Sequence, residues 1–264
     1  MGIINTTPDS FSDGGLYADR DAALRHGLSL VEQGANLLDI GGESTRPGAE
    51  VVTEQEEMDR VIPVIERLSQ ATDIPISIDT HKPAVMRAAL AAGAQMVNDV
   101  KALSAVGALD VVSEAGVPVC LMHMQGEPSS MQDSPQYVDV VDEVVDYLIS
   151  RVTAAVAAGI DRSNLIVDPG IGFGKTLTHN LRLLSSIAEI RARVGCPVLI
   201  GVSRKSMIDA LLGRSVSERV PASIGLATQA ALNGAAILRV HDVQATHDAV
   251  RSAEAVARVR KTQP

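Results

Sequence analysis

The run VPVCLMH (117–123), the segment VVDEVVDYLISRVTAAVAAG (140–159) and the run LIVDPG (165–170) follow one another in the chain and decide its fold. Both runs are rich in Val, Ile and Leu without alternating polar residues, which is typical of strands buried on both faces. The segment between them has helical periodicity and ends at Gly159, and glycine favours the left-handed conformation that ends many helices. The stretch therefore predicts a strand–helix–strand unit with parallel strands.

The same unit recurs along the chain. Similar apolar runs lie at 2–5, 36–42, 75–79, 96–100, 197–203 and 236–242. Further glycines suited to helix ends are Gly34, Gly93, Gly116, Gly195 and Gly234. Residues Thr53 to Glu56 form a capping box, and Pro83 suits a first helical turn.

Eight strands that alternate with helices in 264 residues have the size of a parallel (β/α)8 barrel, or TIM barrel. The alternative is a doubly wound open sheet, which usually has fewer strands and often a glycine fingerprint after the first one; the sequence shows no such fingerprint. We therefore predict an α/β fold of the (β/α)8 TIM barrel type, with one domain over residues 1–264. In this fold the active site lies at the C-terminal ends of the strands.

The composition is that of a folded, acidic protein. Apolar residues make up 46%, aromatic residues 2%, and the formal net charge is −9. This balance argues against nucleic-acid binding, which needs clustered Lys and Arg or stacking side chains. Cys120 and Cys196 lie in apolar runs without metal-ligand spacing, so we expect reduced core residues of an intracellular protein.

No targeting signal is recognised in the sequence. The stretch 220–238 has no charge and is long enough to span a bilayer. It contains polar side chains and two glycines, however, and a helix followed by a strand explains it better. We expect a cytoplasmic protein without a membrane partner.

Polar residues stand at the end of every predicted strand. These are Asn5; Asp39 with residues 43–46; Asp79; Asn98 and Asp99; His123; Asp168; residues 203–205; and Arg239, His241 and Asp242. Buried polar groups often pair with one another or cap helices, and we expect this of about half of them. The remaining strand-end residues are candidates for binding or catalysis.

Two groups of these residues have distinct binding properties. Asn5, Arg239 and His241 belong to the first and last strands, which become neighbours in a closed barrel, and they suit a pyrophosphate with its Mg²⁺. The other group suits a flat heterocycle with several N–H donors, because carboxylates accept parallel hydrogen bonds. Its members are Asp79, Asn98 and Asp168, with Lys205 donating to the acceptor side of the ring.

Several familiar motifs nearly match and are rejected. Residues 170–176, GIGFGKT, resemble a phosphate loop, but Pro169 stands where that motif needs a glycine. Residues 201–205 resemble a nucleophile elbow, except that Lys205 replaces the final glycine. The six histidines do not have the spacing of a zinc hydrolase. Two polar loops, 6–15 and 41–50, follow the first two strands and are long enough to be lids.

Taken together, the motifs resemble the dihydropteroate synthases of the pterin-binding family. The matching segments are NTTPDSFSDGG, GGESTRPGA, SIDTHKP, VND, LMHMQG, DPGIGFGK, SRKSM and RVHDV, in order over nearly the whole chain. The resemblance implies an enzyme of folate and tetrahydrofolate biosynthesis that condenses 6-hydroxymethyl-7,8-dihydropterin pyrophosphate with 4-aminobenzoate. It further implies Mg²⁺ as cofactor, a homodimer and a target of sulfonamides.

The resemblance also assigns roles residue by residue. It makes Asn5 a Mg²⁺ ligand and places Arg239 and His241 at the pyrophosphate. The residues implied to bind the pterin are Asp79, Asn98, Asp168 and Lys205. Those implied near the aminobenzoate are Phe11, Thr45, Arg46, Pro47, Phe173 and Ser206. We predict Asp79, Lys205, Arg239 and His241 as catalytic.

The departures from the family pattern are small. His81 stands where many relatives have serine, and we expect this difference to lie at the surface. The chain begins at the first barrel strand, whereas relatives usually carry an N-terminal hairpin, which should affect stability rather than chemistry. One alternative is a pterin-dependent methyltransferase, which would have no reason for the RVHD motif (239–242) or the first-loop motif. The other is a non-catalytic pterin-binding paralogue, which should have lost Lys205, Arg239 or the two loops.

Overall fold

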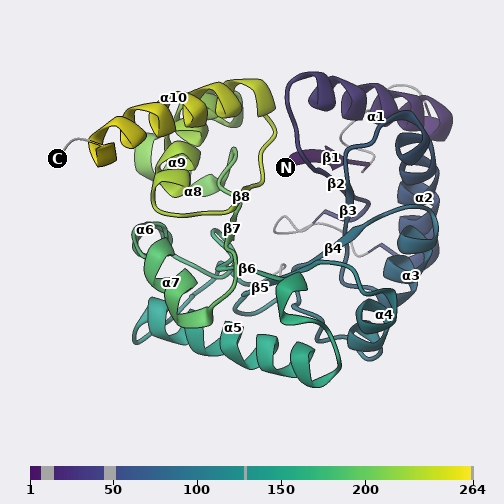
Figure 1. Cartoon of the computed structure of the whole chain (residues 1–264), viewed down its shortest axis with the longest axis horizontal. Coiled ribbons are helices and arrows are strands. Elements are labelled where there is room, and N and C mark those ends of the chain that lie inside the picture. Colours follow the sequence, from purple (N-terminus) through teal and green to yellow (C-terminus); the bar gives the residue numbers. More distant parts are fainter. Residues whose placement is uncertain (7–14, 45–51, 128–129, 263–264) are drawn as a thin grey trace.

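Six parallel strands form a continuous sheet in their order along the chain. The computed structural model describes residues 1–6, 15–44, 52–127 and 130–262. The strands of this sheet are β1 (Gly2–Asn5), β2 (Leu38–Gly41), β3 (Ile76–Asp79), β4 (Met96–Asp99), β5 (Val119–Met122) and β6 (Leu165–Asp168). Figure 1 shows them following one another around a ring.

Two further strands close the ring. β7 (Leu199–Ile200) pairs with β8 (Ile237–Leu238) in parallel. A parallel bridge from Val167 to Val198 joins β6 to the β7 segment, and another from Gly2 to Val240 joins β1 to the β8 segment. Eight parallel strands thus form a closed barrel, and the predicted (β/α)8 fold is confirmed.

The helices lie outside the strands, as Figure 1 shows. They are α1 (Gly15–Glu32), α2 (Glu54–Ala71), α3 (Pro83–Ala91), α4 (Ala108–Ala115), α5 (Val140–Ala157), α6 (Leu177–Ser185), α7 (Ile187–Val194), α8 (Ser206–Leu212), α9 (Val220–Leu232) and α10 (Val243–Thr262). Short 3₁₀ turns occupy 162–164 and 216–218.

The predicted helix boundaries are confirmed at several points. Thr53 and Glu56 form a reciprocal capping box at the start of α2, and Pro83 is the first residue of α3. All six glycines named above have positive φ, between +64° and +115°. The uncharged stretch 220–238 is indeed a helix followed by a strand. No helix among the described residues is long and apolar enough to cross a membrane.

The barrel has an apolar interior at one end and a polar interior at the other. Alternate residues of a strand face opposite sides, so Met96 and Asn98 share the inner face while Val97 packs toward the helices. Met96 clusters with Cys120 and Leu199, both almost fully buried. The cysteines, Cys120 and Cys196, are buried and unpaired, as predicted. Toward the carboxyl ends of the strands, the inward residues become Asp79, Asn98 and Asp168.

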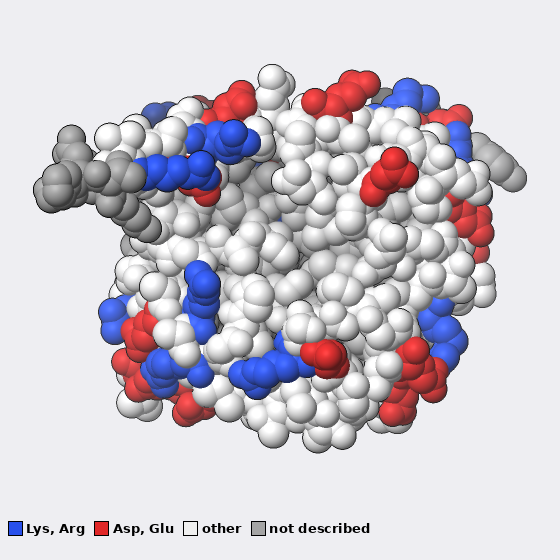
Figure 2. Space-filling model, viewed as in Figure 1, with Lys and Arg blue, Asp and Glu red and all other residues white. Residues whose placement is uncertain are grey.

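The charges on the outer surface are mixed. On the face drawn in Figure 2, Lys and Arg side chains of the described residues alternate with Asp and Glu around the rim, and uncharged residues cover the centre. The ionic groups that concern function lie inside the ring of strands, where Asp39 is fully buried and Asp168 is 7% exposed.

Gly170 provides a test of how tightly the loop after β6 is held. Its φ is +69°, and a Cβ atom there would collide with the carbonyl oxygen of His123. We expect Gly170→Ala to lower the free energy of unfolding by about 3 kcal/mol or more, from left-handed strain plus overpacking. Gly107→Ala is the matched control, because Gly107 also has positive φ but its Cβ would meet nothing within 4 Å. Urea unfolding that gives equal losses for both variants would contradict the close contact.

Candidate active site

A network of polar side chains spans the barrel at the carboxyl ends of its strands. Asp79 ends β3 and is the register partner of Asn98 in β4. Arg239 follows β8 directly, and its Nη2 lies 2.6 Å from Oδ2 of Asp79. Its Nε lies 2.5 Å from Oδ2 of Asp39 in β2, and the Asn98 amide donates to that same oxygen at 3.2 Å. Residues distant in sequence therefore meet in one ionic network.

The carboxyl group of Asp79 is held in an unusual state. Burial raises its pKa to about 7, while Arg239 acts in the opposite direction and Asp39 adds to the increase. Two carboxylates that share one guanidinium cannot both be fully compensated. Asp79 can therefore exchange a proton near neutral pH, which is a property of many functional sites.

Asp168 and Lys205 form the opposite wall. Oδ1 of Asp168 accepts a hydrogen bond from the Gly170 N–H at 2.7 Å, and burial raises the pKa of Asp168 against the effect of Lys205. Lys205 Nζ donates to the carbonyl oxygen of Ile171 and lies 4.5 Å from the ring centre of Phe173. Burial lowers the pKa of Lys205 to about 8, opposed by Asp168. The Asp168 oxygen that does not bind Gly170 can thus accept from the donor edge of a ring, and the ammonium of Lys205 can donate to the acceptor edge of the same ring.

The predicted anion-binding residues lie where β1 and β8 adjoin. Asn5 ends β1, half-buried, and the bridge from Gly2 to Val240 places β1 beside the segment that carries His241. Nδ1 of His241 lies 2.9 Å from the Ser203 hydroxyl, which also accepts from the His241 N–H. Ser206 is the exposed first residue of α8, directly after Lys205.

Four predicted contacts with the aminobenzoate, Phe11, Thr45, Arg46 and Pro47, lie outside the described residues. The two proposed lids, 6–15 and 41–50, fall largely in the same segments. These assignments remain predictions from the sequence.

Other polar strand-end residues have structural partners, as expected for about half of them. Arg204 forms a double ion pair with Asp242, at 2.6 and 3.1 Å, and this ties the loop after β7 to the loop after β8. Asp99 accepts hydrogen bonds from the N–H groups of Lys101 and Leu103, so it caps a turn.

His123 is also engaged, because its Nδ1 lies 3.0 Å from the ammonium nitrogen of Lys175. Burial lowers the pKa of Lys175 to about 7 and that of His123 to about 3. Lys175 donates as well to the carbonyl oxygen of Phe173, at 2.9 Å. This buried pair fixes the loop after β6, and no local sequence pattern predicts the pairing of His123 with Lys175.

His81 is not the surface residue that the sequence predicted. Its side chain is 26% exposed and lies 3.6 Å from Glu43. Glu43 also accepts from the Val52 N–H, and Lys82 contacts Glu43, the Val52 carbonyl and the fully buried Glu57. The side chain of His81 therefore borders a buried ionic cluster formed by Glu43, Glu57 and Lys82.

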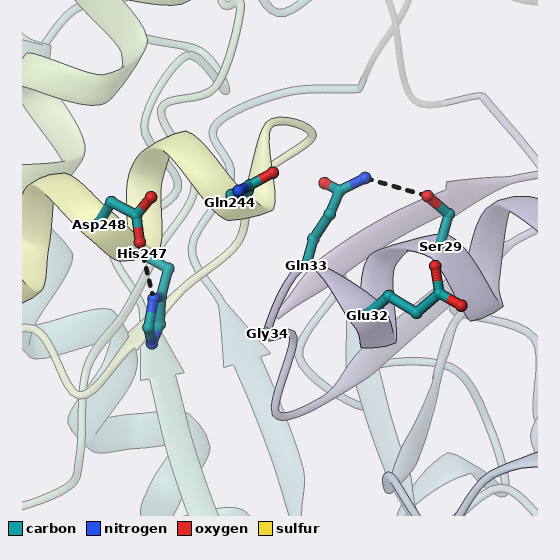
Figure 3. A pocket seen from close by; sticks show the side chains of 7 residues that line it. All are labelled: Ser29, Glu32, Gln33, Gly34, Gln244, His247 and Asp248. Carbon is teal, nitrogen blue, oxygen red and sulfur yellow. Dashed lines mark hydrogen bonds and ion pairs between the residues drawn. The ribbon is translucent and has the colours of Figure 1, made fainter.

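A separate cavity of about 450 Å³ lies between the end of α1 and the start of α10. Figure 3 shows its polar lining, in which Gln33 contacts Ser29 and His247 contacts Asp248. None of the residues of the strand-end network lines this cavity. It is distinct from the candidate active site.

Comparison with known proteins assigns this arrangement to a family. The model of the pterin binding enzymes matches residues 1–241. The dihydropteroate synthase of Escherichia coli (strain K12) is 49% identical over 97% of this chain and 90% of that protein. The chain belongs to the dihydropteroate synthases of the pterin-binding family. The resemblance inferred from the sequence motifs is thereby confirmed.

Solved structures of dihydropteroate synthases have the same fold. The enzyme of Xanthomonas albilineans with 4-aminobenzoic acid is 53% identical, with a TM-score of 0.93, over 100% of this chain and 93% of that one. The enzyme of Yersinia pestis with a sulfonamide drug is 48% identical, with a TM-score of 0.93, over 98% of this chain and 94% of that one. These relatives favour the synthase over the methyltransferase and paralogue alternatives.

The raised pKa of Asp79 gives a testable pH dependence. Its proton is held more tightly in the folded protein than in the unfolded chain, where Asp titrates near pH 4. Between about pH 4 and about pH 7 the unfolded state loses this proton first, so the contribution of Asp79 to stability falls as the pH rises. We expect the free energy of unfolding of the wild type, minus that of Asp79→Asn, to decrease over this range and then level off. Urea unfolding at each pH measures this difference; an increase with pH would show that Arg239 outweighs burial.

Proposed function

We propose that this chain condenses 6-hydroxymethyl-7,8-dihydropterin pyrophosphate with 4-aminobenzoate to give 7,8-dihydropteroate and pyrophosphate, a transferase step of folate biosynthesis. The observation that carries the proposal is the convergence of Asp79, Asn98, Asp168, Lys205 and Arg239 at one end of the barrel. A Xanthomonas albilineans dihydropteroate synthase in complex with 7,8-dihydropteroate, 50% identical with a TM-score of 0.89, supports it.

The pterin ring binds between the two walls of the site. The free oxygen of Asp168 accepts from the amino group and ring N–H, and Lys205 donates to the acceptor edge of the ring. Asn98 and Asp79 bind the opposite edge. Because Asp168 already accepts from Gly170, its carboxylate orientation is set before the pterin arrives.

The pyrophosphate binds at Arg239 and His241. Among the described residues no group of three or more His, Cys, Asp or Glu could hold a metal ion. Mg²⁺, however, takes one or two protein oxygens and completes its coordination with phosphate and water. The half-buried amide of Asn5, at the end of β1, fits such a site, where Mg²⁺ would neutralise charge on the pyrophosphate.

The aminobenzoate binds beside Phe173 and Ser206, with Phe11, Thr45, Arg46 and Pro47 contributed by the two loops. The Phe173 ring already packs against the Lys205 ammonium, so the pterin and aminobenzoate sites share a wall. Sulfonamides would occupy the same place, as analogues of the second substrate.

The reaction is a dissociative substitution. The aryl amine is a neutral nucleophile and needs little help from a base. When the bond to pyrophosphate breaks, the dihydropterin ring delocalises the positive charge that forms at its exocyclic methylene. Asp79 and Asp168 stabilise this charge, Arg239 and His241 bind the leaving anion, and the exclusion of water protects the cation from capture. The amine then attacks the methylene carbon and releases a proton.

The proposal extends to the organisation and the location of the protein. Residues 1–264 would act as a single domain, in a cytoplasmic homodimer whose partners are its two small-molecule substrates. The match of 100% of this chain to a solved dihydropteroate synthase supports the single domain.

The activity itself is directly testable. Purified protein with Mg²⁺ and both substrates should release pyrophosphate in step with the formation of dihydropteroate. A methyltransferase or a binding protein would form neither product. Equal release of pyrophosphate without 4-aminobenzoate would contradict the condensation.

Asp168 should carry much of the pterin recognition. In Asp168→Asn the amide oxygen can still accept from Gly170, but the NH₂ group then faces the N–H donors of the pterin. We expect pterin binding to weaken by about 2–5 kcal/mol, for one lost charged hydrogen bond and one unsatisfied donor. Calorimetry measures the affinity, with Asp161→Asn as control, because Asp161 caps an exposed turn with the same side chain. Near-normal affinity in a folded Asp168→Asn protein would show that Asp168 is only a structural cap.

A further inference from the structure

Asp39 is a buried carboxylate in the middle of the network that has no substrate role in the assignments above. It lies in the interior of β2, fully shielded from solvent. Its Oδ2 accepts from Arg239 Nε at 2.5 Å and from Asn98 Nδ2 at 3.2 Å. One oxygen therefore holds a residue assigned to the pyrophosphate and a residue assigned to the pterin.

The other oxygen of Asp39 accepts no hydrogen bond from the described residues. Oδ1 is buried without a hydrogen-bond partner among the described residues, and so is the hydroxyl of Ser77, its register partner in β3. A buried carboxylate with an unpaired oxygen costs free energy. An amide of the same shape would keep an acceptor for Arg239 and Asn98 and would avoid part of this cost. The charge of Asp39 is therefore better explained by the site than by the stability of the barrel.

The geometry of Arg239 shows what that charge achieves. The guanidinium carries five N–H donors, and Asp39 and Asp79 occupy one on Nε and one on Nη2, along the same edge. These two contacts, each with a different carboxylate, fix the plane of the guanidinium and leave three N–H donors for another anion. Asp79 alone, at a single Nη2 contact, would leave the plane free to rotate.

We propose that Asp39 is a positioning residue, which orients Arg239 toward the pyrophosphate and Asn98 toward the pterin without contacting either substrate. This inference rests on the proposed function. It predicts that losing the charge of Asp39 weakens the binding of the pterin pyrophosphate and of free pyrophosphate, and leaves the aminobenzoate site intact.

The test compares Asp39→Asn with Asp99→Asn in the full chain with Mg²⁺. Both wild-type residues are fully buried carboxylates of barrel strands, Asp39 in β2 and Asp99 in β4, but Asp99 faces away from the network and caps a turn. In Asp39→Asn we expect KM for the pterin pyrophosphate and the inhibition constant of pyrophosphate to rise at least tenfold. KM for 4-aminobenzoate, at saturating pterin substrate, should stay within twofold. Asp99→Asn should lower Tm more than Asp39→Asn does and keep all three constants within twofold.

A double-mutant cycle tests whether Asp39 acts through Arg239. In Arg239→Met protein, adding Asp39→Asn should change the calorimetric affinity for pyrophosphate with Mg²⁺ less than twofold. A persistent tenfold effect would show that Asp39 acts independently of Arg239 and would overturn the proposal. Unchanged constants in Asp39→Asn would also overturn it, because the charge would then have no part in substrate binding. A parallel shift of all three constants, or failure of that variant to fold, would overturn it by making the carboxylate a stabilising group. Absence of product from the wild type would instead overturn the proposed function.

Discussion

The ionic contact of Arg239 with Asp39 and Asp79 is the interaction on which the site depends. It joins a residue that follows the last strand to residues of the second and third strands, so it exists only when the barrel is closed. Burial works against the charge on Arg239, but Asp39 and Asp79 outweigh it and raise its pKa. Because the three residues come from β2, β3 and the end of β8, strand register and barrel closure together bring them into contact.

The barrel can hold this network because its interior changes character along the strands. Met96, Cys120 and Leu199 fill one end with apolar side chains, and the polar groups lie above them. The apolar end excludes water from one side of the polar groups, and this strengthens the electrostatic interactions between them. In the proposed reaction, the fixed dipoles and charges of this polar end replace water around the substrates and stabilise the separation of charge.

The loop after β6 supplies the other half of the site by a different physical means. Gly170 has no room for a Cβ atom, and the buried contact between Lys175 and His123 stabilises the loop. As a result the Ile171 carbonyl and the Phe173 ring both meet the Lys205 side chain. Backbone carbonyls and glycine conformations thus position a cation that faces Asp168, and the two walls of the site are built independently.

The sequence by itself determined the strand–helix repeat, because apolar runs, capping boxes and helix-ending glycines are local signals. Its motifs also determined the family and most of the polar strand ends, including Asp79, Asn98, Asp168 and Lys205. The tertiary structure alone decided which of these residues interact. Arg204 pairs with Asp242, His81 lies beside Glu43, and Asp39 pairs with Arg239. A charged residue inside the apolar run NLLDIGG was the single sequence signal for Asp39, and it did not reveal a partner 200 positions away. Such pairings depend on strand register and barrel closure, which bring distant side chains together and are not encoded in any local pattern.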